Sequence, residues 1–147
     1  MVKSALVIAA GLLLLPGLAG ASSKGGKGAA ILVPAADVKW ADVPGMDGVK
    51  MAVLGGAPDK GASHFLIKLA AGRTVPLHFH NPDHFAYVVS GTMTFGGDGK
   101  ETSLPAGSYF SFVGKKKHTT RCDAGADCVL FMDARGKWDV VPVETAK

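Results

Sequence analysis

The sequence predicts an all-β sandwich or barrel that forms one domain. Short apolar or alternating runs recur along the chain, and no segment after residue 21 keeps a helical period for twelve residues. A length of 147 residues with 48% hydrophobic side chains fits a single domain with its own core. The predicted strands, in chain order, are Val49–Leu54, His64–Ala70, His84–Ser90, Thr92–Phe95, Ser108–Val113, His118–Cys122, Cys128–Met132 and Trp138–Val141.

Turn residues separate these runs. Glycine supplies positive φ angles, proline fixes φ, and Asn and Asp bond to nearby backbone, so their clusters indicate turns. Eight or nine short strands joined in this way are typical of sandwiches and barrels. The clusters are Gly55–Asp59, Asn81–Asp83, Gly96–Gly99, Pro105–Gly107 and Gly125.

Residues 1–21 have the pattern of a secretory signal. Lys3 gives a positive start, Ala5–Leu15 is an apolar run, and Ala19-Gly20-Ala21 is a small-residue cleavage site. A membrane anchor is the alternative, but that run is far shorter than the roughly 20 residues needed to span a bilayer. The sequence therefore predicts a periplasmic or secreted protein without a membrane span in its mature form. A flexible lead-in at 22–29 and a domain at 30–147 follow.

The charge of the chain limits its expected binding partners, and its two cysteines indicate a disulfide. The formal net charge is +4, with no arginine cluster and one lysine run at Lys115–Lys117, so nucleic acid is not an expected partner. That run is a solvated turn or, alternatively, a feature that draws anionic ligands. Cys122 and Cys128 flank a turn-like loop, and an oxidising compartment favours a disulfide between them. Two reduced packing cysteines are the alternative.

Four of the five histidines are candidates for a metal site: His78, His80, His84 and His118. His78 and His80 lie two apart on a predicted strand, so their side chains leave the same face. The turn before His84 reverses the chain and brings a third imidazole beside the first pair. His118 is the first residue of a later predicted strand, which can return to the same pocket. The alternative is a pair of exposed histidines on an edge strand. His64 is predicted to be structural, and binding is expected to weaken toward about pH 6, near the reference pKa of imidazole.

The spacing of this segment resembles the first motif of the cupin superfamily. It reads Gly72, five residues, His78, one, His80, three, His84, six, Gly91. The fourth of these positions is normally glutamate in cupins, and here it is His84. The second motif is partial, because His118 is present, the proline is missing and the glycine, Gly114, is shifted by one. The turn Leu104–Ser108 also resembles the one found there in cupins.

The resemblance implies a double-stranded β-helix, the jelly-roll barrel, with His78, His80 and His118 as ligands and His84 in the place of the glutamate. Such a nitrogen set suits a divalent transition metal, Zn, Cu, Fe, Ni or Mn. Asp83, one position short, fits the turn instead. The aromatic residues expected in the core or barrel lining, one or two of them at the pocket, are Phe79, Phe85, Tyr87, Phe110 and Phe112.

Three functions remain open at this point. The first is an exported metal-binding cupin that binds or acts on a small molecule, as an oxygen-dependent dioxygenase for example. The second is a non-enzymatic binder or sensor of metal or ligand, favoured because no obvious general base accompanies the histidines. The third is a structural domain with incidental histidines. No catalytic residue is assigned, and pairing of edge strands makes a homodimer plausible.

Overall fold

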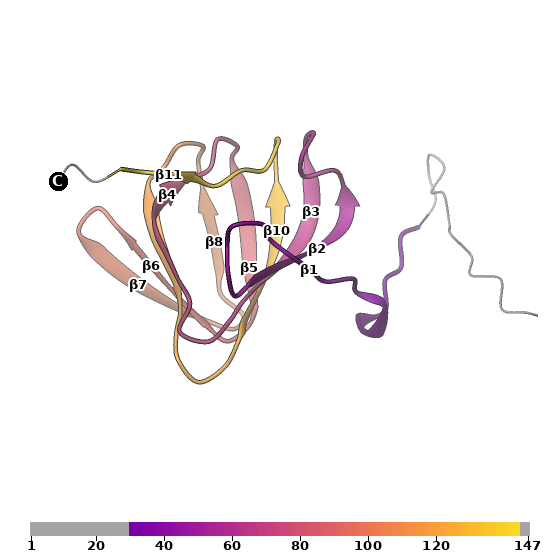
Figure 1. Cartoon of the computed structure of the whole chain (residues 1–147), viewed down its shortest axis with the longest axis horizontal. Helices are drawn as coiled ribbons and strands as arrows, with labels where there is room; N and C mark the ends of the chain where they lie inside the picture. Colours follow the sequence, from indigo (N-terminus) through magenta and orange to yellow (C-terminus); the bar gives the residue numbers. More distant parts are fainter. Residues whose placement is uncertain (1–29, 145–147) are drawn as a thin grey trace, which may run out of the picture. The chain divides into compact units, whose positions relative to one another are not determined.

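Two antiparallel sheets face each other in the computed structural model, which describes residues 30–144 (Figure 1). The predicted signal segment and lead-in lie outside the described residues. One sheet has the order β1 (Ala41–Asp42), β2 (Val49–Gly56), β3 (Ser63–Leu69), β10 (Cys128–Ala134), β5 (His84–Ser90), β8 (Tyr109–Phe112). The other has the order β11 (Val141–Pro142), β4 (Thr74–Phe79), β9 (His118–Cys122), β6 (Thr92–Gly97), β7 (Lys100–Pro105). A single 3₁₀ turn, η1 (Ala35–Asp37), precedes them in the described chain.

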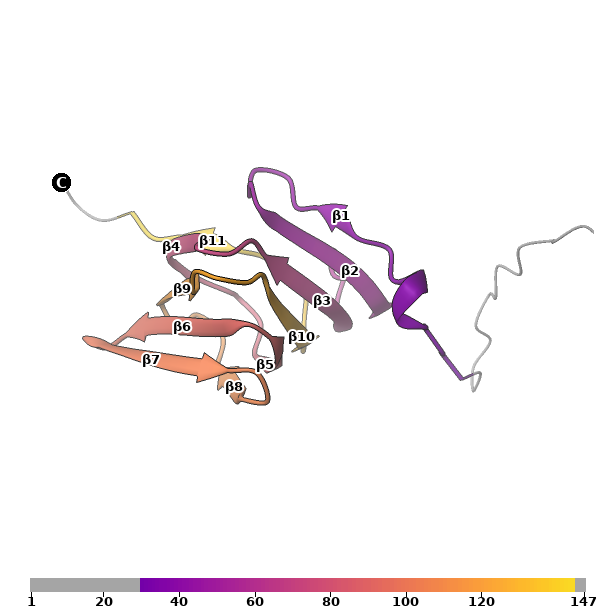
Figure 2. The same cartoon turned by 90° about the horizontal axis from the view of Figure 1, so that it is seen from below.

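This architecture confirms the prediction of an all-β jelly roll. Figure 2 shows β7, β6, β9, β4 and β11 side by side, in the order given by their hydrogen bonds. From Val33 onwards the described residues belong to one compact unit. No helix in the described residues has the length and apolar character required to cross a bilayer.

Alternating burial explains why the core lies between the sheets. Successive side chains of a strand point to opposite faces, and β3 and β10 alternate buried and less buried positions along their whole length. Phe65 from β3 and Met93 from β6 are both fully buried, so the two sheets contribute to one core. Burying a side chain of this size contributes about 1.5–3 kcal/mol relative to exposure.

Several strands differ from the predicted ones: β1 is absent from the predicted ranges, and β4 was predicted only as the strand that carries His78. Strand β7 was not predicted, since nearly all of its residues are exposed and it therefore lacks the apolar alternation of a half-buried strand. The predicted strand at Trp138–Val141 is wrong for most of its length, because only Val141 belongs to a strand, β11. The preceding residues run irregularly past the histidines, and the Trp138 N–H donates to Pro58 O at 2.7 Å.

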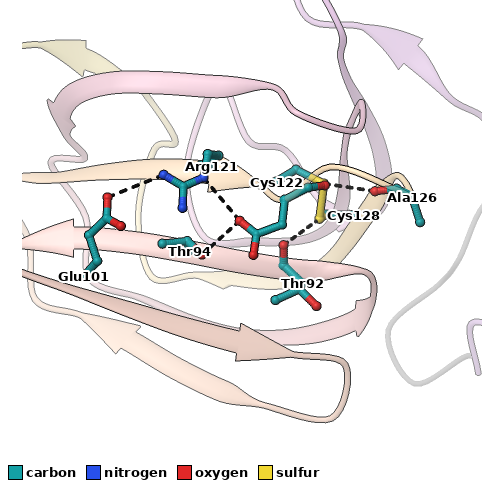
Figure 3. Close-up of polar contacts among 8 residues, drawn as sticks. Thr92, Thr94, Glu101, Arg121, Cys122, Ala126 and Cys128 are labelled. Atoms are coloured by element: carbon teal, nitrogen blue, oxygen red, sulfur yellow. Dashed lines mark hydrogen bonds and ion pairs between the residues drawn. A yellow bond between two sulfur atoms is a disulfide. The ribbon is translucent and has the colours of Figure 1, made fainter.

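A disulfide joins the two sheets at one end of the domain. Cys122 ends β9 and Cys128 begins β10, their Cα atoms are 5.7 Å apart, and both are fully buried (Figure 3). Gly91 packs against this bridge with φ +76°, and a Cβ there would lie 2.7 Å from Cys128 Sγ. Only glycine fits such a position, which gives a physical reason for the glycine that closes the cupin-like spacing.

Reduction of this disulfide should lower the free energy of unfolding by about 2 kcal/mol. The sequence separation of 6 closes a short loop, so the bridge removes only a modest amount of entropy from the unfolded chain. Urea unfolding with and without reductant measures the change. A Cys122→Ala, Cys128→Ala double variant is the control and should not respond to reductant. Identical curves for the native protein in both conditions would contradict the expectation.

Candidate metal centre

Three separate segments bring the histidines together. His78 on β4 pairs in register with His118, the first residue of β9. His80 lies just beyond the end of β4, and His84 is the first residue of β5 in the opposite sheet. All four side chains are buried, with at most 7% of their surface exposed. Four imidazoles from both sheets therefore line the same end of the barrel.

Three of these histidines form a compact group. In His78, His80 and His118 one nitrogen of each ring lies within 4.8 Å of the others, close enough to hold one metal ion. His84 lies outside this group, although its ring centroid is 4.8 Å from that of His80 and 6.3 Å from that of His118. Ligation by His84 stays a prediction.

Backbone carbonyls set the tautomer of each ring. A carbonyl oxygen only accepts, so a ring nitrogen beside it must carry the proton. Nδ1–H of His78 donates to Pro76 O at 2.7 Å, and Nδ1–H of His118 donates to Lys116 O at 3.0 Å. Nδ1–H of His80 donates to Asp139 O. Nε2 of these rings is therefore the nitrogen with a free lone pair. Hydrogen bonds from the other ring nitrogen to a carbonyl orient histidine ligands in metal sites.

Burial favours the neutral form of all four imidazoles. Desolvation lowers the pKa of His80 to about 3 and that of His118 to about 4, with smaller contributions from neighbouring histidines. Burial also lowers the pKa of His78 and His84. The expectation that metal binding weakens toward pH 6 therefore needs correction: protons compete with the metal only at lower pH, because the folded site resists protonation.

Two aromatic side chains hold the rings in place. Trp138 stacks on His80 with ring centroids 4.0 Å apart, and Phe112 stacks on His118 with centroids 4.1 Å apart and planes 5° apart. The sequence predicted Phe112 as one of five aromatic residues of the core or barrel lining, but it did not indicate a role for Trp138 at the site. It also missed Asp139, whose carboxylate accepts a hydrogen bond from the Asn81 N–H at 2.8 Å. Neither residue carries a local signal, since each is more than 50 positions from its partner in the sequence.

The turn before His118 has an unusual backbone. Lys115 adopts φ +66°, and its N–H donates to His80 O at 2.7 Å. This hydrogen bond links the turn before His118 to the segment that carries His80. Position 115 is where the cupin-like motif would have its glycine, given the shift of one noted for Gly114. The chain thus keeps a left-handed conformation that favours glycine while carrying lysine.

Lys115→Gly should stabilise the protein by about 0.5–1 kcal/mol. Glycine removes the left-handed penalty of about 1–2 kcal/mol, and the greater freedom of the unfolded chain offsets part of that gain. Urea unfolding of the variant measures the change. Lys117→Gly is the matched control and should destabilise, because Lys117 has no positive φ. Equal effects of the two substitutions would contradict the argument.

The remaining predicted residues lie away from the three-histidine group. His64 is exposed on the outer face of its sheet, 3.6 Å from Asp133, which agrees with a structural role. Asp83 accepts from the Gly114 N–H at 2.7 Å and so belongs to the turn. The lysine run is exposed, and Lys116 pairs with Asp98 at 2.5 Å.

A cavity of about 600 Å³ adjoins the histidines. Its wall is predominantly apolar, with side chains from both sheets and from the irregular segment that carries Trp138. Of the five predicted aromatic residues, Phe110 lines this cavity, while Phe79, Phe85, Tyr87 and Phe112 do not. An apolar cavity with a few convergent polar groups is typical of small-molecule sites.

The barrel and its buried histidines define a member of the cupin superfamily. The chain belongs to the family of the ChrR cupin-like domain, whose model matches residues 28–137. No curated protein sequence matches the chain.

Solved structures with this fold have varied functions. The polyketide cyclase RemF from Streptomyces resistomycificus is 21% identical, with a TM-score of 0.66 over 79% of this chain and 87% of that one. A predicted oxalate decarboxylase from Thermotoga maritima is 21% identical, with a TM-score of 0.61 over 71% and 98%. A structure of Rhodobacter sphaeroides SigE in complex with the anti-sigma ChrR is 26% identical, with a TM-score of 0.55 over 69% and 51%. These neighbours share the fold and leave the activity open.

Proposed function

We propose that this protein binds a divalent transition metal through Nε2 of His78, His80 and His118, and that the metal binds or transforms a small molecule in the adjoining cavity. The observation that carries the proposal is the group of three buried imidazoles within 4.8 Å, each oriented by a backbone carbonyl. Three neutral nitrogen donors fit Zn, Cu, Fe, Ni or Mn and disfavour Mg and Ca. A bound metal would supply Lewis-acid chemistry or, with a redox-active ion, electron transfer.

The protein's own residues perform the other tasks of such a site. The carbonyls of Pro76, Lys116 and Asp139 keep protons on Nδ1, so Nε2 stays ready to ligate. Trp138 and Phe112 exclude water from one face of His80 and His118. The apolar wall of the cavity favours a ligand with an apolar body.

An oxygen-dependent dioxygenase is the activity we propose first, and a non-enzymatic metal or ligand binder is the alternative. The alternative is favoured by the shortage of a base. Among the described residues that line the cavity, Asp139 is the sole carboxylate, and both of its oxygens already accept hydrogen bonds from Asn81. Position 84 carries a histidine where a cupin normally has glutamate, and burial lowers the pKa of that histidine.

Metal analysis followed by an oxygen-uptake assay tests the proposal. Purified protein should contain close to one transition-metal ion per chain, and turnover of a phenol, diketone or thiol with a redox-active metal would support the dioxygenase. Stoichiometric Zn without turnover would support the binder. Protein that neither retains nor takes up any of these metals would overturn the proposal in both forms.

His84→Glu should keep the metal and shift the preference toward harder ions. Glutamate is the residue of the resembling motif at this position, and its negative charge favours Mn or Fe over softer ions. Competition between Zn and Mn for the apo form of each protein measures the preference. His84→Gln is the matched control, because it changes the side chain without adding charge. Equal Mn preference in both variants would contradict a role of His84 beside the metal.

We also propose that the chain is exported and cleaved after Ala21, which would make it periplasmic or secreted. The proposal rests on the charged start, apolar run and small-residue site in residues 1–21, and the disulfide agrees with an oxidising compartment. The intact mass of exported protein should match a chain that begins at Ser22. An uncleaved mass or purely cytosolic recovery would contradict it.

A further inference from the structure

Arg73 lies at the end of the cavity opposite the histidines. In the five-stranded sheet His78 pairs with His118 at one end, and Val75 pairs with Thr120 further along. Beyond that pair the Arg73 carbonyl accepts from the Cys122 N–H at 2.9 Å, next to the disulfide. Arg73, Val75 and both histidines line the cavity, so the strand leads from the metal ligands to the cation.

The side chain of Arg73 is half-buried and has no acidic partner within the described part of the chain. Its Nε is buried and meets no hydrogen-bond acceptor among the described residues. The ion pairs of residues 30–144 do not include it. Arg121 on the neighbouring strand, by contrast, pairs with Glu101 (Figure 3) and also with Asp123. A buried donor without a partner is costly, and a ligand that supplies an acceptor removes that cost.

The backbone around Arg73 fixes its position. Its N–H donates to Ala70 O at 2.9 Å, and its carbonyl accepts from Cys122, so both backbone groups are engaged. The aliphatic part of the side chain passes Gly48, where a Cβ would lie 3.8 Å from Arg73 Cδ. This arginine is thus held at the cavity wall by the loop before β2, the start of β4 and the end of β9.

We propose that Arg73 binds the carboxylate of an organic acid whose apolar body fills the cavity and whose other end approaches the metal. Arg73 is the single Lys or Arg among the described residues that line this predominantly apolar wall. A guanidinium matches a carboxylate through two parallel hydrogen bonds, and these are strong where water is excluded. This inference rests on the proposed function for its metal end and deepens it by naming the class of ligand.

The length of the strand sets the size of the acid. His78 is five positions after Arg73, but a β-bulge lies between Val75 and His78, and the paired strand covers the same span in the four steps from Cys122 to His118. At about 3.3 Å per residue this span is about 13 Å. Side chains project into the cavity from both ends, so the ligand has less than this span to cross. A straight chain of about eight carbons spans that distance, whereas a four-carbon acid does not reach from one end to the other.

Calorimetric titration of metal-free protein with octanoate and with 1-octanol tests the assignment. The two probes share an apolar chain and differ in charge. Native protein should bind octanoate, and Arg73→Gln should weaken that binding about tenfold or more while leaving 1-octanol unchanged. Arg73→Lys should retain part of the affinity. Arg121→Gln is the matched control, since it removes the same charge from the neighbouring strand outside the cavity, and it should change neither titration.

Several outcomes would overturn the assignment. Octanoate that does not bind the native protein, or that binds Arg73→Gln as tightly, excludes Arg73 as its partner. Equal losses for octanoate and 1-octanol would reduce its role to packing. His78→Ala separates this inference from the proposed metal site, because its octanoate binding should survive. Native protein that takes up no metal but whose octanoate binding still depends on Arg73 would overturn the proposed function. It would leave the proposed acid site standing.

Discussion

Replacement of His78, His80 or His118 by alanine should reduce metal affinity by about 100-fold or more. Changes to residues that merely orient a ligand already lower affinity by about 10–100-fold, and removal of the ligand itself has a larger effect. Among the described residues the group within 4.8 Å has no fourth donor, because one nitrogen from each of these three rings makes it up. Metal content after dialysis, together with titration of apo protein with Zn, measures the loss.

His64→Ala is the matched control for these three variants. His64 is exposed on the outer face of its sheet, so the variant should bind metal as the native protein does. Circular dichroism and thermal unfolding confirm that each variant is folded. Full metal occupancy in His78→Ala or His118→Ala would contradict the centre, and so would loss of metal from His64→Ala alone.

The fold could be predicted largely because its strands alternate. Strands such as β3 and β10 have one face in the core, and this physical demand leaves a period of two in the sequence. Strand β7 escaped prediction because it is exposed on nearly all positions and its partner β6 alone defines it. Pairing between strands is a property of the folded chain, and an exposed edge strand leaves little trace in its own residues.

The site could be predicted in part for a similar reason. His78, His80 and His84 are near one another in the sequence, so a strand and a turn bring them together. His118 was linked to them through its resemblance to a second motif. Trp138, Asp139 and Arg73 carry no such local pattern, since an irregular segment and the register between strands place them at the cavity. Their roles follow from contacts over long separations in the chain, which spacing alone does not encode.

The metal-free protein should lose stability steeply as the pH falls from 6.5 to about 4.5. Burial lowers the pKa of His80 to about 3 and that of His118 to about 4, whereas an imidazole in the unfolded chain has a pKa near 6.5. Between these values the unfolded state binds protons that the folded state refuses. Stability therefore rises with pH in this window, is fully present above pH 6.5, and is lost as the pH falls toward the folded pKa values.

Two such histidines give a slope of about 2.7 kcal/mol per pH unit, since each proton taken up on unfolding contributes about 1.36 kcal/mol. Urea unfolding of metal-free protein at several pH values between 7 and 4.5 measures this slope. His118→Gln should flatten it by removing one titrating group, whereas His64→Ala, on the exposed outer face, should leave it close to the native slope. A free energy of unfolding that stays constant from pH 6.5 to 4.5 would show that protons reach the imidazoles in the folded state. The inference that burial lowers the pKa values of His80 and His118 would then be wrong.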